Sequence, residues 1–161
     1  MKISLLLGSV IVAALAVAYA LPGRRSASRK AIIKAPSEKV FEKVTNIADQ
    51  SWRSNVSEVR VVDSTAGREV WVEKPKKGPD MRFRTKAKMP AKRFDIEIID
   101  NPRFGGHWVG TFVARPDGQT EIEFTEEVVV AGLMPKLLSY AFFNIEESVE
   151  TYIADLKKAL E

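Results

Sequence analysis

Cysteine is absent from this 161-residue sequence, and histidine occurs only once, as His107. Without cysteine the chain cannot form a disulfide and cannot carry out thiolate chemistry. With a single imidazole it cannot build a site that needs two, and no group of His and carboxylate residues has the spacing of a metal site. We therefore expect neither a metal ion nor another cofactor.

Acidic residues are absent from the first 30 positions, which contain five bases. The formal net charge of +4 therefore comes from the N-terminal segment, because residues 31–161 contain 20 bases and 21 acids. A basic tail next to a nearly neutral domain does not indicate a nucleic-acid-binding surface. We expect no nucleic-acid partner.

Charge is also absent from residues 3–21, ISLLLGSVIVAALAVAYAL. As a helix this run would be about 28 Å long, which matches the hydrocarbon thickness of a bilayer. We expect an uncleaved single-pass membrane anchor with the domain in the cytoplasm, because more bases follow the run than precede it. The bases that follow would lie among anionic lipid headgroups, and they are Arg24, Arg25, Arg29 and Lys30.

A cleaved signal peptide is the alternative interpretation of the same run. Ala18-Tyr19-Ala20 has the small-x-small form of a signal-peptidase site, and Lys2 supplies a positive start. Cleavage after Ala20 would leave a secreted or periplasmic domain. In both interpretations the chain divides into an anchor or signal segment at 1–22, a linker at 23–28 and one domain at 29–161.

The domain begins with a helical pattern and continues with strands. We predict a short strand at 31–34, a helix that opens at Pro36, and a second short helix at 48–55. The chain is predicted to close with one long helix at about 134–160, which carries a single apolar stripe. Between them, alternating residues and turn signals predict strands at 57–63, 68–74, 80–88, 92–100, 106–115 and 120–130.

These elements predict an α+β fold, in which a curved antiparallel sheet of six to seven strands wraps around the C-terminal helix. The strand at 80–88 has one charged face without interleaved aromatic residues, which is typical of a solvated surface. Its members are Arg82, Arg84, Lys86 and Lys88.

The opposite face of that strand tapers to Thr85 and Ala87, which fill little space. Either the sheet bends away from the helix and leaves a cavity, or these residues lie opposite Phe142 and Tyr152 and the interior is solid. The residues predicted to line a cavity are Phe83, Thr85, Ala87, Phe94, Trp108, Gly110, Phe112, Phe124, Glu126, Phe142 and Val149.

Glu126 is the acid of most interest, because it shares strand parity with inward-facing Phe124 and Val128. A carboxyl group at that position would be desolvated, its pKa would be raised, and it could act as a general acid or base or bind a ligand. Alternatively the strand twists out at this point, or a base pairs with it. Glu73 shares the parity of Trp71, with Arg53 or Arg68 as available partners. No catalytic residue is assigned, and Glu126 is only a weak candidate.

The order of these elements and several motifs resemble the SRPBCC superfamily, the helix-grip group that includes START lipid-transfer domains and birch-pollen-allergen-like proteins. The matching stretches are IKAPSEKVFEKVTNIADQSWRSNV, GREVWVEKPKKGPDMRFRT, PAKRFDIEIIDNPRFGGHWVGTF and GQTEIEFTEEVVV, and they look most like the polyketide cyclase/dehydrase-like branch. The resemblance implies a deep, mostly apolar cavity between sheet and helix. The N-terminal apolar run lies outside the family pattern.

From the pattern and the resemblance together we expect a membrane-tethered binding protein for a hydrophobic small molecule, such as a lipid, a quinone or other isoprenoid, or a polyketide-like compound. The alternative is a cyclase or dehydratase-like enzyme that uses the same cavity with an acid/base pair. A third hypothesis is a membrane-tethered interaction module with a solid core. We expect the chain to be a monomer.

Overall fold

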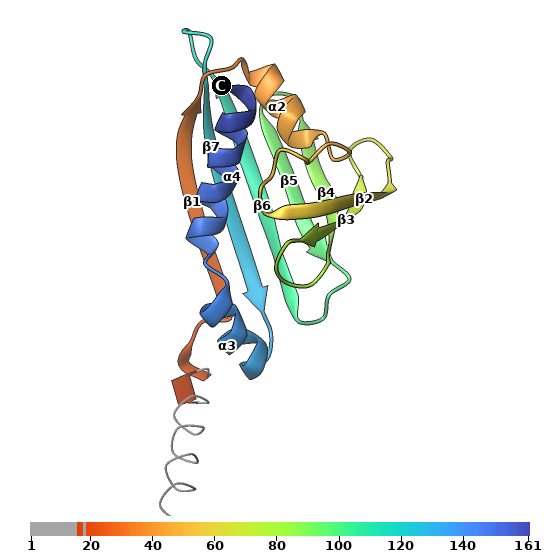
Figure 1. Cartoon of the computed structure of the whole chain (residues 1–161), viewed down its shortest axis with the longest axis vertical. Coiled ribbons are helices and arrows are strands. Elements are labelled where there is room, and N and C mark those ends of the chain that lie inside the picture. The colour runs from red at the N-terminus through yellow and green to blue at the C-terminus, as the bar shows by residue number, and fades with distance from the viewer. Residues whose placement is uncertain (1–15, 18) are drawn as a thin grey trace, which may run out of the picture.

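The computed structural model describes residues 16–17 and 19–161, in which seven strands form a single sheet with helices at its side (Figure 1). No helix in this part of the chain is long and apolar enough to cross a membrane. Most of the predicted anchor, residues 3–21, lies outside the described residues. The elements are β1 (Arg24–Ile33), α2 (Ser37–Thr45), β2 (Val56–Asp63), β3 (Val70–Pro75), β4 (Met81–Met89), β5 (Arg93–Ile99), β6 (Phe104–Ala114), β7 (Thr120–Val130), α3 (Leu133–Phe142) and α4 (Ile145–Leu160).

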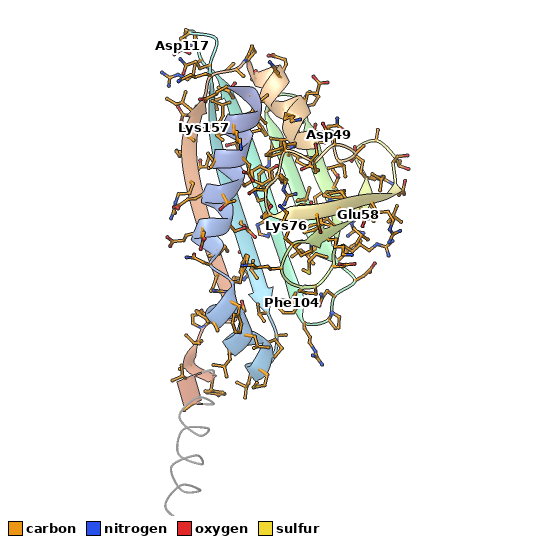
Figure 2. All side chains as sticks on the ribbon, in the orientation of Figure 1. Asp49, Glu58, Lys76, Phe104, Asp117 and Lys157 are labelled. Atoms are coloured by element: carbon orange, nitrogen blue, oxygen red, sulfur yellow. The ribbon has the colours of Figure 1, made fainter. Side chains whose placement is uncertain are left out.

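The sheet is antiparallel throughout, with strand order β1-β7-β6-β5-β4-β3-β2. The chain runs as a meander from β2 to β7, and β1 then pairs with β7 along ten residues. Helix α4 lies against β1 and β7, and α2 lies near β6 (Figure 1). The β6–β7 turn with Asp117 and the start of β6 at Phe104 lie toward opposite ends of the sheet (Figure 2). The predicted helix-grip architecture is confirmed.

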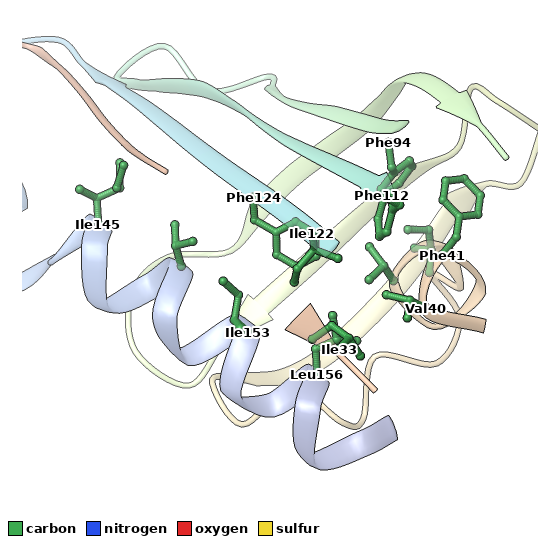
Figure 3. Close-up of a cluster of buried hydrophobic side chains, with 14 of the residues drawn as sticks. Ile33, Val40, Phe41, Phe94, Phe112, Ile122, Phe124, Ile145, Ile153 and Leu156 are labelled. Carbon is green, nitrogen blue, oxygen red and sulfur yellow. The ribbon is translucent and has the colours of Figure 1, made fainter. Parts of the chain in front are cut away.

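The core lies between α4, α2 and the inward face of the sheet. Ile122 and Phe124 of β7 are fully buried, as is Leu156 of α4. Figure 3 shows the apolar side chains of α4 directed toward those of β7, while Phe94 and Phe112 lie beside α2. Period-two alternation on β7 and the apolar stripe on α4 therefore predicted the two surfaces that meet.

The predicted linker at 23–28 is wrong from Arg24 onward, because β1 begins there. Ala27 faces inward and is buried, whereas the hydroxyl of Ser28 lies 2.9 Å from that of Thr125 on β7. The short polar residues looked like a linker, but in the structure they alternate as a strand should. The cause is pairing with β7, which is distant in sequence.

Two predicted helices differ from the structure. Residues 48–55 form turns and not a helix. The side-chain amide of Gln50 donates to the carbonyl groups of Val44 and Asn46, which are the backbone acceptors that a continuing helix would use. The single helix at 134–160 is two helices, α3 and α4, separated by an extended Phe143. Asn144 caps α4, because its side-chain oxygen accepts from the N–H groups of Glu146 and Glu147.

Strand β4 contains a register shift between Thr85 and Ala87 that reverses the predicted alternation. After the shift Ala87 lies opposite Asp95, on the outer face, and Lys88 lies opposite buried Phe94. Lys88 therefore points inward, where its ammonium group lies 3.0 Å from Glu69. The predictions that Ala87 lines the cavity and that Lys88 belongs to the solvated face do not hold, because an extra residue in a strand moves every later side chain to the other face.

The indole of Trp108 occupies the space next to Gly110 of β6, where any other residue would place its side chain. A Cβ atom there would lie 2.6 Å from Cη2 of Trp108 and 3.2 Å from Phe124. We expect Gly110→Ala to lower the free energy of unfolding by about 1–3 kcal/mol in urea denaturation, because the partly buried indole of Trp108 must move.

The matched control for this substitution is Gly105→Ala in the same strand. A Cβ atom at Gly105 would make an ordinary contact of 3.9 Å with Val129. This variant should keep the stability of the wild type within about 0.5 kcal/mol. An equal loss in both variants would show that the ring of Trp108 is not the cause.

Candidate ligand-binding cavity

A cavity of about 90 Å³ lies between the sheet, α4 and the segment that joins α2 to β2. Its walls combine aromatic rings with a group of polar and charged side chains. The lining residues are Val44, Ile47, Gln50, Arg53, Asn55, Trp71, Glu73, Phe83, Phe94, Ile96, Trp108, Glu126, Ser148 and Tyr152. A cavity is therefore present where the grip was predicted to leave one, but it is small and more polar than the resemblance implied.

Four of the residues predicted for the site line this cavity, namely Phe83, Phe94, Trp108 and Glu126. Four others are buried next to it without lining it, namely Thr85, Phe112, Phe124 and Val149. Gly110 lies beneath the Trp108 ring, and Ala87 faces outward after the register shift. Phe142 is 83% exposed at the end of α3, because the terminal helix is interrupted after it.

Aromatic rings fill most of the space that the small residues leave. The Trp108 ring centroid lies 4.8 Å from that of Phe124 and 5.4 Å from that of Tyr152. Tyr152 also contacts Trp52, with 5.1 Å between the centroids. Solid packing by Tyr152, one of the two alternatives at the sequence level, thus accounts for the small volume, whereas Phe142 takes no part.

A buried ion pair forms the charged side of the cavity. Arg53 and Glu73 are 2.8 Å apart, with side chains 14% and 10% exposed, and the indole N–H of Trp71 donates to the same carboxylate at 3.0 Å. Burial is the largest single influence on the pKa of Arg53 and lowers it, but the charge and hydrogen bond of Glu73 together with nearby Tyr152 and Glu126 outweigh burial. The pKa is therefore raised and the guanidinium stays charged. The guanidinium also lies 5.1 Å from the ring centroid of Tyr152. Of the two partners considered for Glu73, the structure pairs it with Arg53.

Glu126 enters the cavity from β7, where it is paired across the sheet with Trp108. Burial raises the pKa of this carboxyl, although a hydrogen bond with Ser148 and the charge of Arg53 oppose the shift. The inward orientation predicted from strand parity is confirmed. A carboxyl that holds its proton to higher pH can donate a hydrogen bond or a proton to an oxygen atom of a ligand.

The raised pKa of Glu126 predicts how stability depends on pH. The folded protein keeps this proton at pH values where the unfolded chain, with the ordinary value of 4.5, has lost it. The stability from protonated Glu126 is therefore present below the ordinary pKa and is lost as pH rises through the raised pKa. We expect Glu126→Gln to lose less stability than the wild type from acidic to neutral pH, measured by urea denaturation.

Glu121→Gln is the control for this pH series, because Glu121 lies on the same strand with a side chain that is 45% exposed. Its stability should follow the wild-type pH dependence. If Glu126→Gln also follows the wild type at every pH, burial of this carboxyl does not contribute to the pH dependence.

No group of three or more His, Cys, Asp or Glu side chains in residues 16–17 and 19–161 is arranged to hold a metal ion. His107 lies on the outer face of β6, with its Nδ1 3.4 Å from the carboxylate of Glu127. The polar and charged side chains that line the cavity are those of Gln50, Arg53, Asn55, Glu73, Glu126, Ser148 and Tyr152. Strand parity predicted that Glu126 and Glu73 face inward. Ser148 was not predicted to line the cavity. It lies on α4, one turn before Tyr152, and the start of that helix was predicted at the wrong residue.

A curved antiparallel sheet that grips a C-terminal helix, with a cavity between them, defines the helix-grip class that includes START proteins. Within this class the chain belongs to the family described as "Polyketide cyclase / dehydrase and lipid transport", whose model matches residues 24–161. The match begins at the first residue of β1 and so includes residues predicted as a linker. No curated protein sequence matches the chain significantly.

Solved structures share this fold at low sequence identity. The di-domain ARO/CYC protein BexL of the BE-7585A biosynthetic pathway matches at 18% identity and a TM-score of 0.68, with 87% of this chain and 51% of that chain covered. The present chain thus spans about half of that protein. The protein TTHA0849 of Thermus thermophilus matches at 16% identity and a TM-score of 0.68, with 84% of this chain and 97% of that chain covered. A START superfamily protein of Mycobacterium smegmatis matches at 16% identity and a TM-score of 0.61, with 84% and 96% covered.

Proposed function

We propose that the protein binds a hydrophobic small molecule in the cavity between the sheet and α4. The observation that carries this proposal is a carboxyl with a raised pKa, Glu126, in a cavity walled by Trp71, Phe83, Phe94 and Trp108. Such a site suits a ligand that presents an apolar or aromatic body to the rings and an oxygen atom to the carboxyl. A quinone or other isoprenoid, a polyketide-like aromatic and a lipid all have this character.

The ligand needs more room than the cavity now offers. Sites for small molecules commonly have volumes of about 300–1,000 Å³, compared with about 90 Å³ here. The segment between α2 and β2 contributes Gln50, Arg53 and Asn55 to the wall and contains neither helix nor strand. We propose that this segment and the ring of Tyr152 shift when a ligand enters, since burial of ligand surface at about 25 cal/mol per Å² offsets the cost.

Residues 3–21 are proposed to tether the domain to a membrane, with the domain in the cytoplasm and the chain a monomer. Support comes from the uncharged run itself and from its position, because only Pro22 and Gly23 separate it from the start of β1 at Arg24. Within the described chain Arg29 pairs with Glu146 and Glu150, and Lys30 lies 3.6 Å from Glu123. Arg24 also lies 3.4 Å from a carboxylate, that of Glu127, but its side chain is 71% exposed and it is the first residue of β1. We propose that Arg24 contacts anionic headgroups. Cleavage after Ala20 would instead release the domain.

A cyclase or dehydratase-like activity is the second candidate. It is favoured by the presence of two different carboxyl environments in one cavity, since Glu126 has a raised pKa whereas Glu73 is held as the partner of Arg53. Glu126 could donate a proton to a departing hydroxyl group, and the charged pair could orient the substrate.

Mass spectrometry of organic extracts from the purified full chain tests these alternatives, with the apo protein then titrated with a fluorescent apolar probe. A stoichiometric copurified lipophile supports the binding protein. A protein without copurified ligand that converts a polyketide-like substrate supports the enzyme, provided that the Glu126→Gln variant no longer converts it. An empty chain that takes up no probe favours a simple interaction module. The mass of the intact protein shows whether it begins at Met1 or Leu21.

A further inference from the structure

Helix α3 exposes its apolar side chains to solvent, unlike an ordinary surface helix, which buries its apolar stripe. Met134, Leu138 and Phe142 are spaced four residues apart and so share one face. Their exposed fractions are 58%, 52% and 83%. The helix contains no acid and only one base, Lys136. This combination leaves a continuous apolar stripe without a partner among the described residues.

The contacts that fix α3 to the domain are mostly polar and lie away from this stripe. The ammonium of Lys136 donates to the carbonyl of Leu21 at 3.1 Å, and the hydroxyl of Tyr140 donates to the carbonyl of Pro22 at 3.1 Å. The guanidinium of Arg25 donates to Ser139 and lies 4.1 Å from the ring centroid of Tyr140. These contacts hold the helix with its apolar side outward.

The same contacts join α3 to the end of the uncharged run at Leu21 and to Pro22, which follows it. Leu21, whose carbonyl accepts from Lys136, is the last residue of that run, and Val17 and Tyr19 within it are exposed. In Figure 1, α3 lies beside the point where the chain enters β1. The exposed stripe and the end of residues 3–21 therefore occupy the same end of the domain. Residues 3–21 are apolar and long enough to enter a bilayer, and α3 exposes apolar side chains next to the last residue of that run. A lipid surface is a partner that would contact both.

We propose that α3 lies in the interface of a phospholipid bilayer, with Met134, Leu138 and Phe142 among the upper acyl chains. This inference rests on the proposed membrane tether and adds a second contact to it. One anchor alone leaves a domain free to turn, whereas two contacts fix its orientation. The end of the sheet with α3 then faces the membrane, and the β6–β7 turn near Asp117 points away from it (Figure 2).

The absence of cysteine makes a direct test available, because a single introduced cysteine can be labelled without background. The full chain is reconstituted into vesicles of phosphatidylcholine and phosphatidylglycerol, with an environment-sensitive fluorophore on Phe142→Cys or Leu138→Cys. Val113→Cys is the control, since Val113 is 59% exposed near the β6–β7 turn. Phospholipids brominated on the acyl chains then quench any label that lies among those chains.

We expect the labels at 138 and 142 to lose most of their fluorescence in brominated vesicles, and the label at 113 to lose none. If the chain floats with vesicles but the labels at 138 and 142 are not quenched, the inference is wrong and the tether stands. If the chain does not float with vesicles, both the tether and the inference fail. A label at 142 shielded in a cross-linkable dimer would assign the stripe to a second copy and overturn the proposal.

Discussion

Replacing Arg53 with methionine is expected to lower the free energy of unfolding by about 3–5 kcal/mol. Arg53 is the ion-pair partner of Glu73, 2.8 Å away, and both side chains are largely buried. Without the guanidinium the carboxylate of Glu73 keeps the N–H of Trp71 as a donor but has no counter-charge. Urea denaturation followed by tryptophan fluorescence measures the loss.

The double variant Arg53→Met, Glu73→Gln separates a lost counter-charge from lost packing. Glutamine still offers an oxygen to the indole N–H of Trp71 but carries no charge, so the double variant should recover most of the stability. A neutral pair in such a place is often as stable as the ion pair it replaces. If the double variant is as unstable as Arg53→Met, packing of the Arg53 stem is the main contribution.

An exposed ion pair on the same sheet provides the matched comparison. Arg84 and Glu97 pair across β4 and β5, and the Arg84 side chain is 51% exposed. We expect Arg84→Met to cost no more than about 1 kcal/mol, because water screens an exposed pair. Similar losses at Arg53 and Arg84 would contradict the argument from burial.

Most of the sheet could be predicted from sequence because each strand carries its own periodic pattern and ends at a strong turn signal. Gly67, Gly78 and Gly118 have positive φ angles of 76°, 107° and 78°, which glycine adopts readily. They lie in turns that were predicted between strands. Strand β1 was predicted too short, since its polar residues form a strand only through pairing with β7.

The parts of the site that sequence did not reveal depend on single-residue irregularities. A one-residue shift in β4 exchanged Ala87 for Lys88 on the inner face, and no composition signal marks it. The break before α4 removed Phe142 from the cavity, although Asn144 followed by Glu146 and Glu147 is a cap signal that would have located it. Arg53 was named only as one of two available partners for Glu73, because it lies in a turn segment, where periodicity does not indicate which way a side chain points.

The ring of Tyr152 is the other position where we expect a large effect, because it limits the size of the cavity. It packs against Trp52, Trp108 and Phe124, with centroid distances of 5.1, 5.4 and 5.5 Å. Tyr152 is partly buried and packs against the core. We expect Tyr152→Ala to lower the free energy of unfolding by about 3–5 kcal/mol, because removal of a ring packed in this way leaves a cavity. The same variant should bind more of a fluorescent apolar probe, because the vacated space joins the cavity.

Tyr152→Phe distinguishes the ring from its hydroxyl group. Burial raises the pKa of this hydroxyl, so it stays protonated and can only donate or accept a hydrogen bond. Phenylalanine keeps the ring contacts, and we expect it to change stability by less than about 1.5 kcal/mol and to leave probe uptake as in the wild type. If the alanine variant is unstable yet takes up no more probe, the walls have collapsed into the vacated space. The ring of Tyr152 would then be a structural part of the core, and ligand entry would have to open the cavity elsewhere, at the segment that carries Arg53.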